Sequence, residues 1–203
     1  MEELAIWERW GGLSGGLVLD YGCGTGWLMQ RLAQWGFKVL GLEVQREFLA
    51  EAGSRVRGLG ALLVLYGGGA LPLKKDSVDL VLAVGVVRSL MDRGPLGEAI
   101  EEWRRCLREG GRVLLIETDN AALRRKIRVQ GIREALQDAG FEVLAWNPIR
   151  KTGWWGLSLV KTGLWPASLY GWMARRELGC RKRGGLGTRG KLAYLGEFRK
   201  GVG

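Results

Sequence analysis

Val18-Leu19-Asp20-Tyr21-Gly22-Cys23-Gly24-Thr25-Gly26 is the stretch of sequence that decides the fold. Its apolar beginning is typical of a strand, and the glycines that follow let the backbone turn tightly and approach a ligand closely. Trp27 then opens an amphipathic segment of helical length, and the amino end of a helix favours negative charge. The stretch therefore predicts a strand, a ligand-binding loop and a helix.

Short apolar runs alternate with amphipathic segments along the rest of the chain. The predicted strands are Leu17–Asp20, Lys38–Leu42, Ala61–Tyr66, Asp79–Val84, Arg112–Glu117, Phe141–Trp146 and Gly156–Lys161. The predicted helices are Trp27–Trp35, Gln45–Val56, Pro95–Arg108 and Ala121–Ala139, the last closed by Gly140. This order predicts an α/β fold, doubly wound, with a mostly parallel seven-stranded sheet and helices on both faces. Ligands of such sheets bind beyond the carboxyl ends of the strands, where the glycine loop lies.

The glycine spacing and an acidic residue after the second strand indicate the ligand. A dinucleotide fingerprint reads Gly-x-Gly-x-x-Gly, whereas here Asp20 leads glycines at every second position. Glu43 follows the second strand, where its carboxylate can accept hydrogen bonds from both hydroxyls of a ribose. Val44 beside it can lie against adenine, as apolar residues do in cofactor pockets. The pattern favours S-adenosylmethionine over NAD as the cofactor.

Four segments together resemble a known family. They are Val18–Leu28, Gly41–Ala52, Ala70–Val84 and Leu107–Glu117, and the whole resemblance covers residues 15–146. The chain is similar here to class I S-adenosylmethionine-dependent methyltransferases of the ubiquinone and menaquinone biosynthesis type. The resemblance implies the Rossmann-like methyltransferase fold, methyl transfer, and a cofactor held by three loops and the end of the fourth strand.

The resemblance also implies which residues bind the cofactor. The loop after the first strand meets the methionine part, Glu43 takes the ribose, the segment before Leu71-Pro72-Leu73 meets adenine, and the end of the fourth strand meets the amino group. The implied cofactor-binding residues are Asp20, Tyr21, Gly22, Cys23, Gly24, Glu43, Val44, Gly69, Ala70, Leu71, Val84 and Gly85.

The sequence departs from the family in two places. Family members usually carry an aspartate for the adenine amine shortly before the Leu-Pro pair, where this chain has Tyr66-Gly67-Gly68-Gly69. Family members often carry histidines after the fourth strand, where this chain has Arg88. The candidates for a catalytic role are Glu117 and Asp119, at the carboxyl end of the fifth strand, and Arg88. A dedicated base is not required, because alignment and exclusion of water accelerate displacement at a sulfonium.

The residue composition excludes several classes of site. The chain has no histidine, which removes the commonest general base and metal ligand. Its cysteines, Cys23, Cys106 and Cys180, are widely spaced and odd in number, which suits reduced thiols in the cytoplasm rather than a zinc site or disulfides. The beginning, Met1–Trp10, carries three glutamates and does not resemble a secretory signal. We expect a cytoplasmic protein without a metal.

The net charge of +10 is concentrated near the carboxyl end of the chain. Residues 1–145 hold 19 Lys and Arg against 19 Asp and Glu, and the remaining residues carry the whole excess. We predict a methyltransferase domain at residues 1–162, with a short N-terminal helix, and a basic extension rich in Trp and Gly at residues 163–203. The stretch from Gly179 to Gly203 looks poorly ordered. The extension is expected to be a solvated segment, to bind nucleic acid, or to lie at an anionic membrane surface or cover an apolar substrate pocket.

The leading functional hypothesis is methyl transfer from S-adenosylmethionine to a small, hydrophobic acceptor. The first alternative is an RNA or protein methyltransferase that uses the basic extension as an anchor. The second alternative is a non-catalytic module that binds S-adenosylmethionine. Ala83–Val86 lacks the Pro-Pro-Tyr type of motif used to methylate amino groups on bases, which favours the leading hypothesis.

Overall fold

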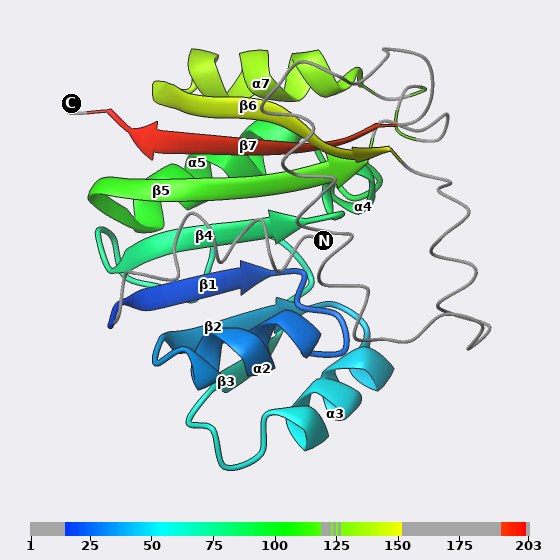
Figure 1. The fold of residues 1–203 in the computed structure, drawn as a ribbon, viewed down its shortest axis with the longest axis vertical. Helices are drawn as coiled ribbons and strands as arrows, with labels where there is room; N and C mark the ends of the chain where they lie inside the picture. The colour runs from blue at the N-terminus through cyan, green and yellow to red at the C-terminus, as the bar shows by residue number, and fades with distance from the viewer. Residues whose placement is uncertain (1–14, 119–122, 124, 126, 152–191, 202–203) are drawn as a thin grey trace.

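The computed structural model describes residues 15–118, 123, 125, 127–151 and 192–201. Over these residues the elements follow one another in a β-α alternation (Figure 1). Their bounds are β1 Leu17–Tyr21, α2 Trp27–Gln34, β2 Lys38–Glu43, α3 Arg46–Arg55, β3 Leu62–Leu65, β4 Val78–Val84, α4 Val87–Met91, α5 Leu96–Cys106, β5 Leu107–Thr118, α7 Val129–Asp138, β6 Phe141–Lys151 and β7 Leu192–Lys200.

The strands form one seven-stranded sheet in the order β3-β2-β1-β4-β5-β7-β6 (Figure 1). Strands β1 to β5 pair in parallel, and β7 lies antiparallel between β5 and β6. The chain order reverses direction across the sheet after β3, when β4 returns to the other side of β1. This confirms the predicted doubly wound, mostly parallel sheet, and it brings the carboxyl ends of β1, β2 and β4 to one edge.

Two apolar cores lie on opposite faces of the sheet, because successive side chains of a strand point to opposite faces. On one face Leu19 of β1 packs in a cluster with Trp103 of α5 and Leu136 of α7. On the other face Val18 packs in a cluster with Met29 and Leu32 of α2. Helices therefore cover both faces, as the sequence predicts.

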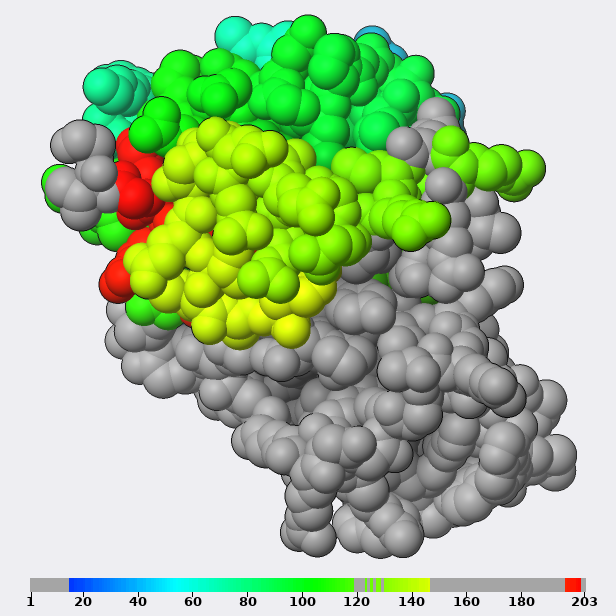
Figure 2. All heavy atoms as spheres, turned by 90° about the horizontal axis from the view of Figure 1, so that it is seen from above, coloured from blue at the N-terminus to red at the C-terminus, as the bar shows by residue number. Residues whose placement is uncertain are grey.

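The seventh strand is not where the sequence predicts it. The predicted strand Gly156–Lys161 falls outside the described residues, and Leu192–Lys200 forms β7 instead. Phe198 of β7 is fully buried, with its ring 5.9 Å from that of Trp146. Seen from the β6 end, β7 shows only at one side of α7 and β6 (Figure 2). The prediction that the last 25 residues are poorly ordered is therefore wrong for Leu192–Lys200.

The charges of β7 are paired with the body of the fold, which explains how a basic segment enters a sheet. Arg112 of β5 pairs with Glu197 at 2.7 Å, and Lys200 pairs with Asp76 at 2.7 Å. Arg199 pairs with Glu142 of β6. The predicted boundary at residue 162, the N-terminal helix and most of the basic extension lie outside the described residues.

Two helix predictions need correction at their ends. The helix predicted over Pro95–Arg108 ends at Cys106, and β5 begins at Leu107. The described helix within Ala121–Ala139 is α7, which starts at Val129, while Gly140 ends it with a φ of +82° as predicted. None of the helices among the described residues has the length and apolar character needed to cross a membrane.

Candidate cofactor site

A cavity of about 700 Å³ opens at the carboxyl edge of β1, β2 and β4. The predicted cofactor residues that line it are Tyr21, Gly22, Gly24, Glu43, Val44, Gly69, Ala70, Val84 and Gly85. Asp20, Cys23 and Leu71 lie beneath its surface and do not line it. The volume lies within the ~300–1,000 Å³ typical of small-molecule sites.

The loop after β1 is fixed against the end of β2. The backbone amides of Gly22 and Cys23 both donate to the carbonyl of Leu42, each at 2.9 Å. A Cβ at Gly22 would clash with Cγ1 of Val86, and the φ there is +77°, so the position favours glycine. A Cβ at Gly24 would meet nothing within 4 Å, because that position faces the open cavity. The loop therefore presents a bare backbone surface to a ligand.

The carboxylate of Glu43 ties this loop to the segment after β2. Its Oε2 accepts a hydrogen bond from the amide of Gly24 at 2.9 Å. Its Oε1 accepts from the amides of Val44 and Gln45 at 2.7 and 3.0 Å. A carboxylate has about four acceptor positions, so about one remains, on Oε2. The side chain that the sequence assigns to two ribose hydroxyls has capacity for one.

Asp20 lies buried under the loop, on the same face of the sheet as Glu43. Its Oδ2 has no hydrogen-bond partner among the described residues. Burial, and secondarily the charge of Glu43, raises the pKa of Asp20 to about 7. Burial likewise raises the pKa of the Cys23 thiol to about 12, which keeps that thiol protonated. An unsatisfied buried carboxyl is typical of functional sites.

The third wall of the cavity comes from the segment after β3. Tyr66, Gly67, Gly68, Gly69 and Ala70 all line the cavity. Leu71 does not, because its backbone turns toward α5, where the amide donates to Glu102 at 2.6 Å.

The candidate catalytic residues are not brought together at the cavity. Glu117 is buried, and its carboxylate accepts from the amides of Val87 at 3.1 Å and Thr118 at 2.9 Å. Burial raises the pKa of Glu117. Arg88 is exposed and pairs with Asp92 at 3.8 Å. Neither Glu117 nor Arg88 lines the cavity, and Asp119 lies outside the described residues.

Several lining residues were not predicted from the sequence. They include Gln45, Phe48, Ser89 and Arg93. Phe48 falls in the amphipathic pattern of α3 and looks like a core residue, although 41% of its surface is exposed at the cavity. Its place in the first turn of α3, shortly after Glu43 and Val44, was the signal that would have found it. Arg93 follows α4 in a turn, and the sequence has no pattern that directs it inward.

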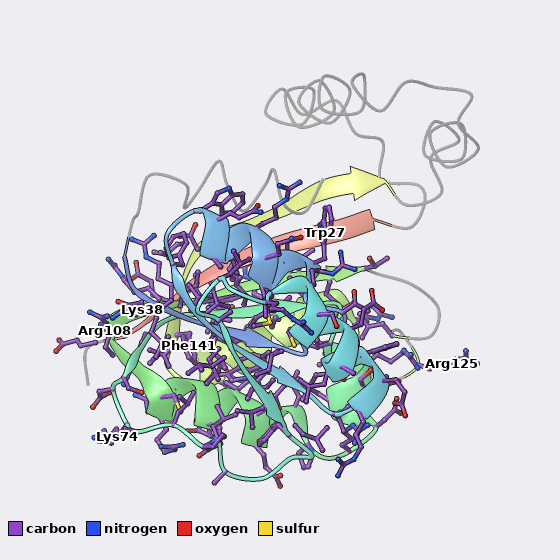
Figure 3. All side chains as sticks on the ribbon, turned by 90° about the horizontal axis from the view of Figure 1, so that it is seen from below. Trp27, Lys38, Lys74, Arg108, Arg125 and Phe141 are labelled. Carbon is purple, nitrogen blue, oxygen red and sulfur yellow. The ribbon has the colours of Figure 1, made fainter. Side chains whose placement is uncertain are left out.

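A smaller cavity of about 270 Å³ lies at the opposite edge of the sheet and includes Asp79 and Arg108. Asp79 accepts from the amide of Leu17 at 2.7 Å and pairs with Arg108. Figure 3 shows Lys38 and Arg108 at this end of the molecule and Arg125 at the other. The arrangement is structural, because the acid is already satisfied by the backbone and the arginine.

The larger cavity fits an adenosyl group with a methionine tail. The open space at Gly24 admits a ligand against the backbone, and the remaining acceptor position on Glu43 suits a hydroxyl. The orphan oxygen of Asp20 leaves an unsatisfied polar atom beneath the loop that would meet the methionine part. Among the described residues, no cluster of three or more acidic or cysteine side chains could hold a metal ion.

Comparison with known proteins finds methyltransferases. Residues 18–111 match a family model described as a methyltransferase domain. An uncharacterised methyltransferase of Geobacillus sp. strain WCH70 is 28% identical over 65% of this chain and 60% of its own length. A probable S-adenosylmethionine-dependent methyltransferase of Mycolicibacterium smegmatis is 30% identical over 62% of this chain and 52% of its own length. The chain thus spans little more than half the length of these relatives.

The fold is also found in solved structures. Geranyl diphosphate methyltransferase, solved with GPP and sinefungin, superposes with a TM-score of 0.72 at 16% identity, covering 98% of this chain and 77% of its own. At that identity the likeness supports the fold alone. The chain is thus similar over residues 18–111 to a methyltransferase domain, and over a longer stretch to a probable S-adenosylmethionine-dependent methyltransferase.

Proposed function

We propose that the protein is an enzyme that transfers a methyl group from S-adenosylmethionine to a small, hydrophobic acceptor. The observation that carries the proposal is the single cavity at which the ends of β1, β2 and β4 and the segment after β3 meet. Each of these segments contributes residues that the sequence assigns to the cofactor.

Each part of the cofactor has a wall suited to its chemistry. Gly22 and Gly24 offer a close backbone surface to the methionine part, and Val84 and Gly85 line the cavity at the end of the neighbouring strand β4. Glu43 has capacity for one ribose hydroxyl. Val44 and the backbone at Gly69 and Ala70 offer flat surfaces for adenine.

The rest of the cavity supports an apolar acceptor of modest size. Beyond the cofactor residues its lining includes the apolar Val86, Leu90, Pro95 and Ala99 and the polar Ser89, Arg93, Glu98, Glu101 and Glu102. The apolar residues suit the body of a small organic ligand, and the polar ones can fix its orientation. A relative in fold, geranyl diphosphate methyltransferase, is named for a small substrate that joins an apolar chain to a charged diphosphate. The size of the cavity disfavours a folded macromolecule.

The residues of this chain contribute mainly alignment and exclusion of water. When bound, the cofactor would supply a methyl group attached to a sulfonium sulfur, a good leaving group for displacement by a nucleophile. The bare loop at Gly24 and the apolar residues beside Val86 align the reactants and keep water out. Both carboxylate oxygens of Glu117 already hold backbone amides, so we assign it no proton transfer.

The test is release of S-adenosylhomocysteine with a panel of acceptors. The panel contains small phenols, thiols and carboxylic acids, together with RNA and a mixture of peptides. We expect turnover with one of the small-molecule classes. Turnover with RNA or peptides alone would overturn the proposal, and cofactor binding without turnover on any acceptor would favour a binding module.

A second arm of the test addresses the basic extension. Lys151 of β6 pairs with Leu192 of β7, so a two-residue Asn-Gly turn can join these strands in place of residues 152–191. We expect this variant to keep its affinity for S-adenosylhomocysteine. Loss of binding to RNA or to anionic vesicles in the same variant would assign that binding to the replaced segment.

A further inference from the structure

The segment after β3 forms a wall of the cavity with almost no side chains of its own. Gly67, Gly68 and Gly69 follow one another, and a Cβ on any of them would meet nothing within 4 Å. Gly68 and Gly69 have φ values of +122° and +86°. Glycines in such conformations have many accessible backbone states, so the wall is not held in place by its own packing.

Contacts outside the glycines fix the near end of the wall. The amide of Tyr66 donates to the carbonyl of Glu43 at 2.8 Å, and its hydroxyl donates to the carbonyl of Gly69. The Tyr66 ring packs edge-on against Tyr21 at 5.9 Å, and Tyr21 packs against Trp103 of α5 at 5.5 Å. This end is therefore attached to β2, β1 and α5.

The far end of the wall is held by Glu102 and Arg105 of α5. The amide of Leu71 donates to Oε2 of Glu102 at 2.6 Å. The guanidinium of Arg105 donates to the carbonyls of Leu71 and Leu73 at 3.0 and 2.8 Å. It also donates twice to Glu102, at 2.9 and 2.8 Å. Bonds of this kind, between charged groups in a fixed fork geometry, are among the strongest in proteins.

The pair is also close to the ligand space. Glu102 lines the cavity itself, and its side chain is 22% exposed. The hydrogen bond from Arg105 lowers the pKa of Glu102, so the carboxylate stays ionised at neutral pH. A charged, doubly bonded pair at one end of a glycine segment restricts the positions that the segment can take.

We propose that Glu102 and Arg105 are positioning residues for the cofactor, which hold the glycine wall at the place where it meets adenine. The inference rests on the proposed function, because it requires the cofactor in this cavity. Without the Glu102–Arg105 pair the glycine segment must become ordered when the ligand binds, and the cost of that ordering reduces the affinity. The effect is confined to ligands that contain adenine.

The experiment is calorimetric titration with S-adenosylhomocysteine and with adenosine. The variants are Glu102→Gln, Arg105→Ala and Arg105→Lys, with Glu142→Gln as the matched control. Glu142 pairs with Arg199 on the surface of β6 and does not line the cavity. Gly24→Ala adds a variant altered on the methionine side only.

We expect Glu102→Gln and Arg105→Ala each to lower the affinity for both ligands about tenfold, which corresponds to ~1.4 kcal/mol. Arg105→Lys keeps the charge and is expected to lose less affinity than Arg105→Ala. It replaces Arg105→Ala in the test if that variant does not fold. The double variant loses no more than either single one. Stoichiometry stays near one, whereas partial unfolding would lower the stoichiometry and leave the Kd unchanged.

Two results would overturn the inference. One is an affinity for S-adenosylhomocysteine in both Glu102→Gln and Arg105→Ala that lies within about twofold of that of the unaltered protein, a difference of ~0.4 kcal/mol. The other is a loss of affinity for S-adenosylhomocysteine in these variants while their affinity for adenosine is unchanged. That pattern is expected for Gly24→Ala instead. Failure of the unaltered protein to bind either ligand would reject the proposed function, and this inference with it.

Discussion

Glu43 at the end of β2 accepts a hydrogen bond from the backbone amide of Gly24 in the loop after β1, at 2.9 Å. One side chain thus joins the two loops that border the cavity. Its other oxygen holds the amides of Val44 and Gln45. Glu43 shapes the site as well as lining it, so substitutions there change both the loop and its ligand.

Gly24→Ala is predicted to weaken S-adenosylhomocysteine binding, because a Cβ at this position enters the space of the ligand. Gly60→Ala is the matched control, since both glycines have positive φ, +53° and +69°, and both face open space. Each variant carries a similar backbone cost of ~1 kcal/mol. Calorimetry should show a loss of affinity for Gly24→Ala alone, and equal affinities in the two variants would argue against a ligand at the loop.

Asp20→Asn is predicted to change the stability of the protein relative to the unaltered chain in a pH-dependent way, more favourably at pH 8 than at pH 5. The folded-state pKa of Asp20, about 7, lies above its unfolded value of 3.8. The unaltered protein therefore loses stability as pH rises from about 4 to about 7, where the folded state holds the extra proton. Asparagine removes this titration.

The size of that effect follows from the pKa difference. Between pH 5 and pH 8 the stability of Asp20→Asn relative to the unaltered chain should rise by on the order of 2 kcal/mol, since one pKa unit is worth ~1.4 kcal/mol. Urea unfolding at the two pH values measures it. A difference between the proteins that is independent of pH would show that Asp20 is ionised throughout this range.

Glu117→Gln is predicted to reduce stability without changing cofactor affinity. The amide nitrogen of glutamine would face one of the two backbone N–H groups that Glu117 now accepts, from Val87 and Thr118. An unsatisfied buried group of this kind costs about 1–3 kcal/mol. Thermal unfolding and calorimetry on the same sample check both statements. Unchanged stability together with lost turnover would instead assign Glu117 a catalytic role.

Phe198→Ala is predicted to lower the free energy of unfolding by about 3–5 kcal/mol, as for other buried aromatic residues. Phe198 is fully buried in β7, whereas Leu144 of β6 is 36% exposed. Leu144→Ala is therefore the control, and its cost should stay within about 1 kcal/mol. Urea unfolding measures both. A cost for Phe198→Ala as small as that of the control would mean that β7 is not part of the folded core.

The sheet could be predicted because its central strands are apolar on both faces. Leu80 and Leu82 of β4 face one core and Val81 faces the other, so the run has no polar alternation. The strand β7 gave no such signal. Gly196, Glu197, Arg199 and Lys200 resemble a solvated tail, and they fit a sheet only because strands distant in sequence supply partners for their charges.

The cavity could be predicted where residues follow directly from strand ends. Gly24, Glu43 and Val84 come at the ends of parallel strands, which meet at one edge. Leu71 was assigned to the cavity and lies in the core, because Glu102 and Arg105 draw its backbone toward α5 from 31 and 34 residues away. Contacts across such distances in the sequence have no local pattern.

The central claim is that this cavity binds S-adenosylmethionine through the loops that Glu43 joins. Calorimetric titration of the unaltered protein and of Glu43→Ala with S-adenosylmethionine tests it most directly. We predict one site per chain, with a Kd in the range of about 1 μM to 1 mM that is usual for enzyme substrates. Glu43→Ala should lower the affinity for S-adenosylmethionine at least tenfold, a loss of ~1.4 kcal/mol or more. Absence of binding, or equal affinity in both proteins, would contradict the account.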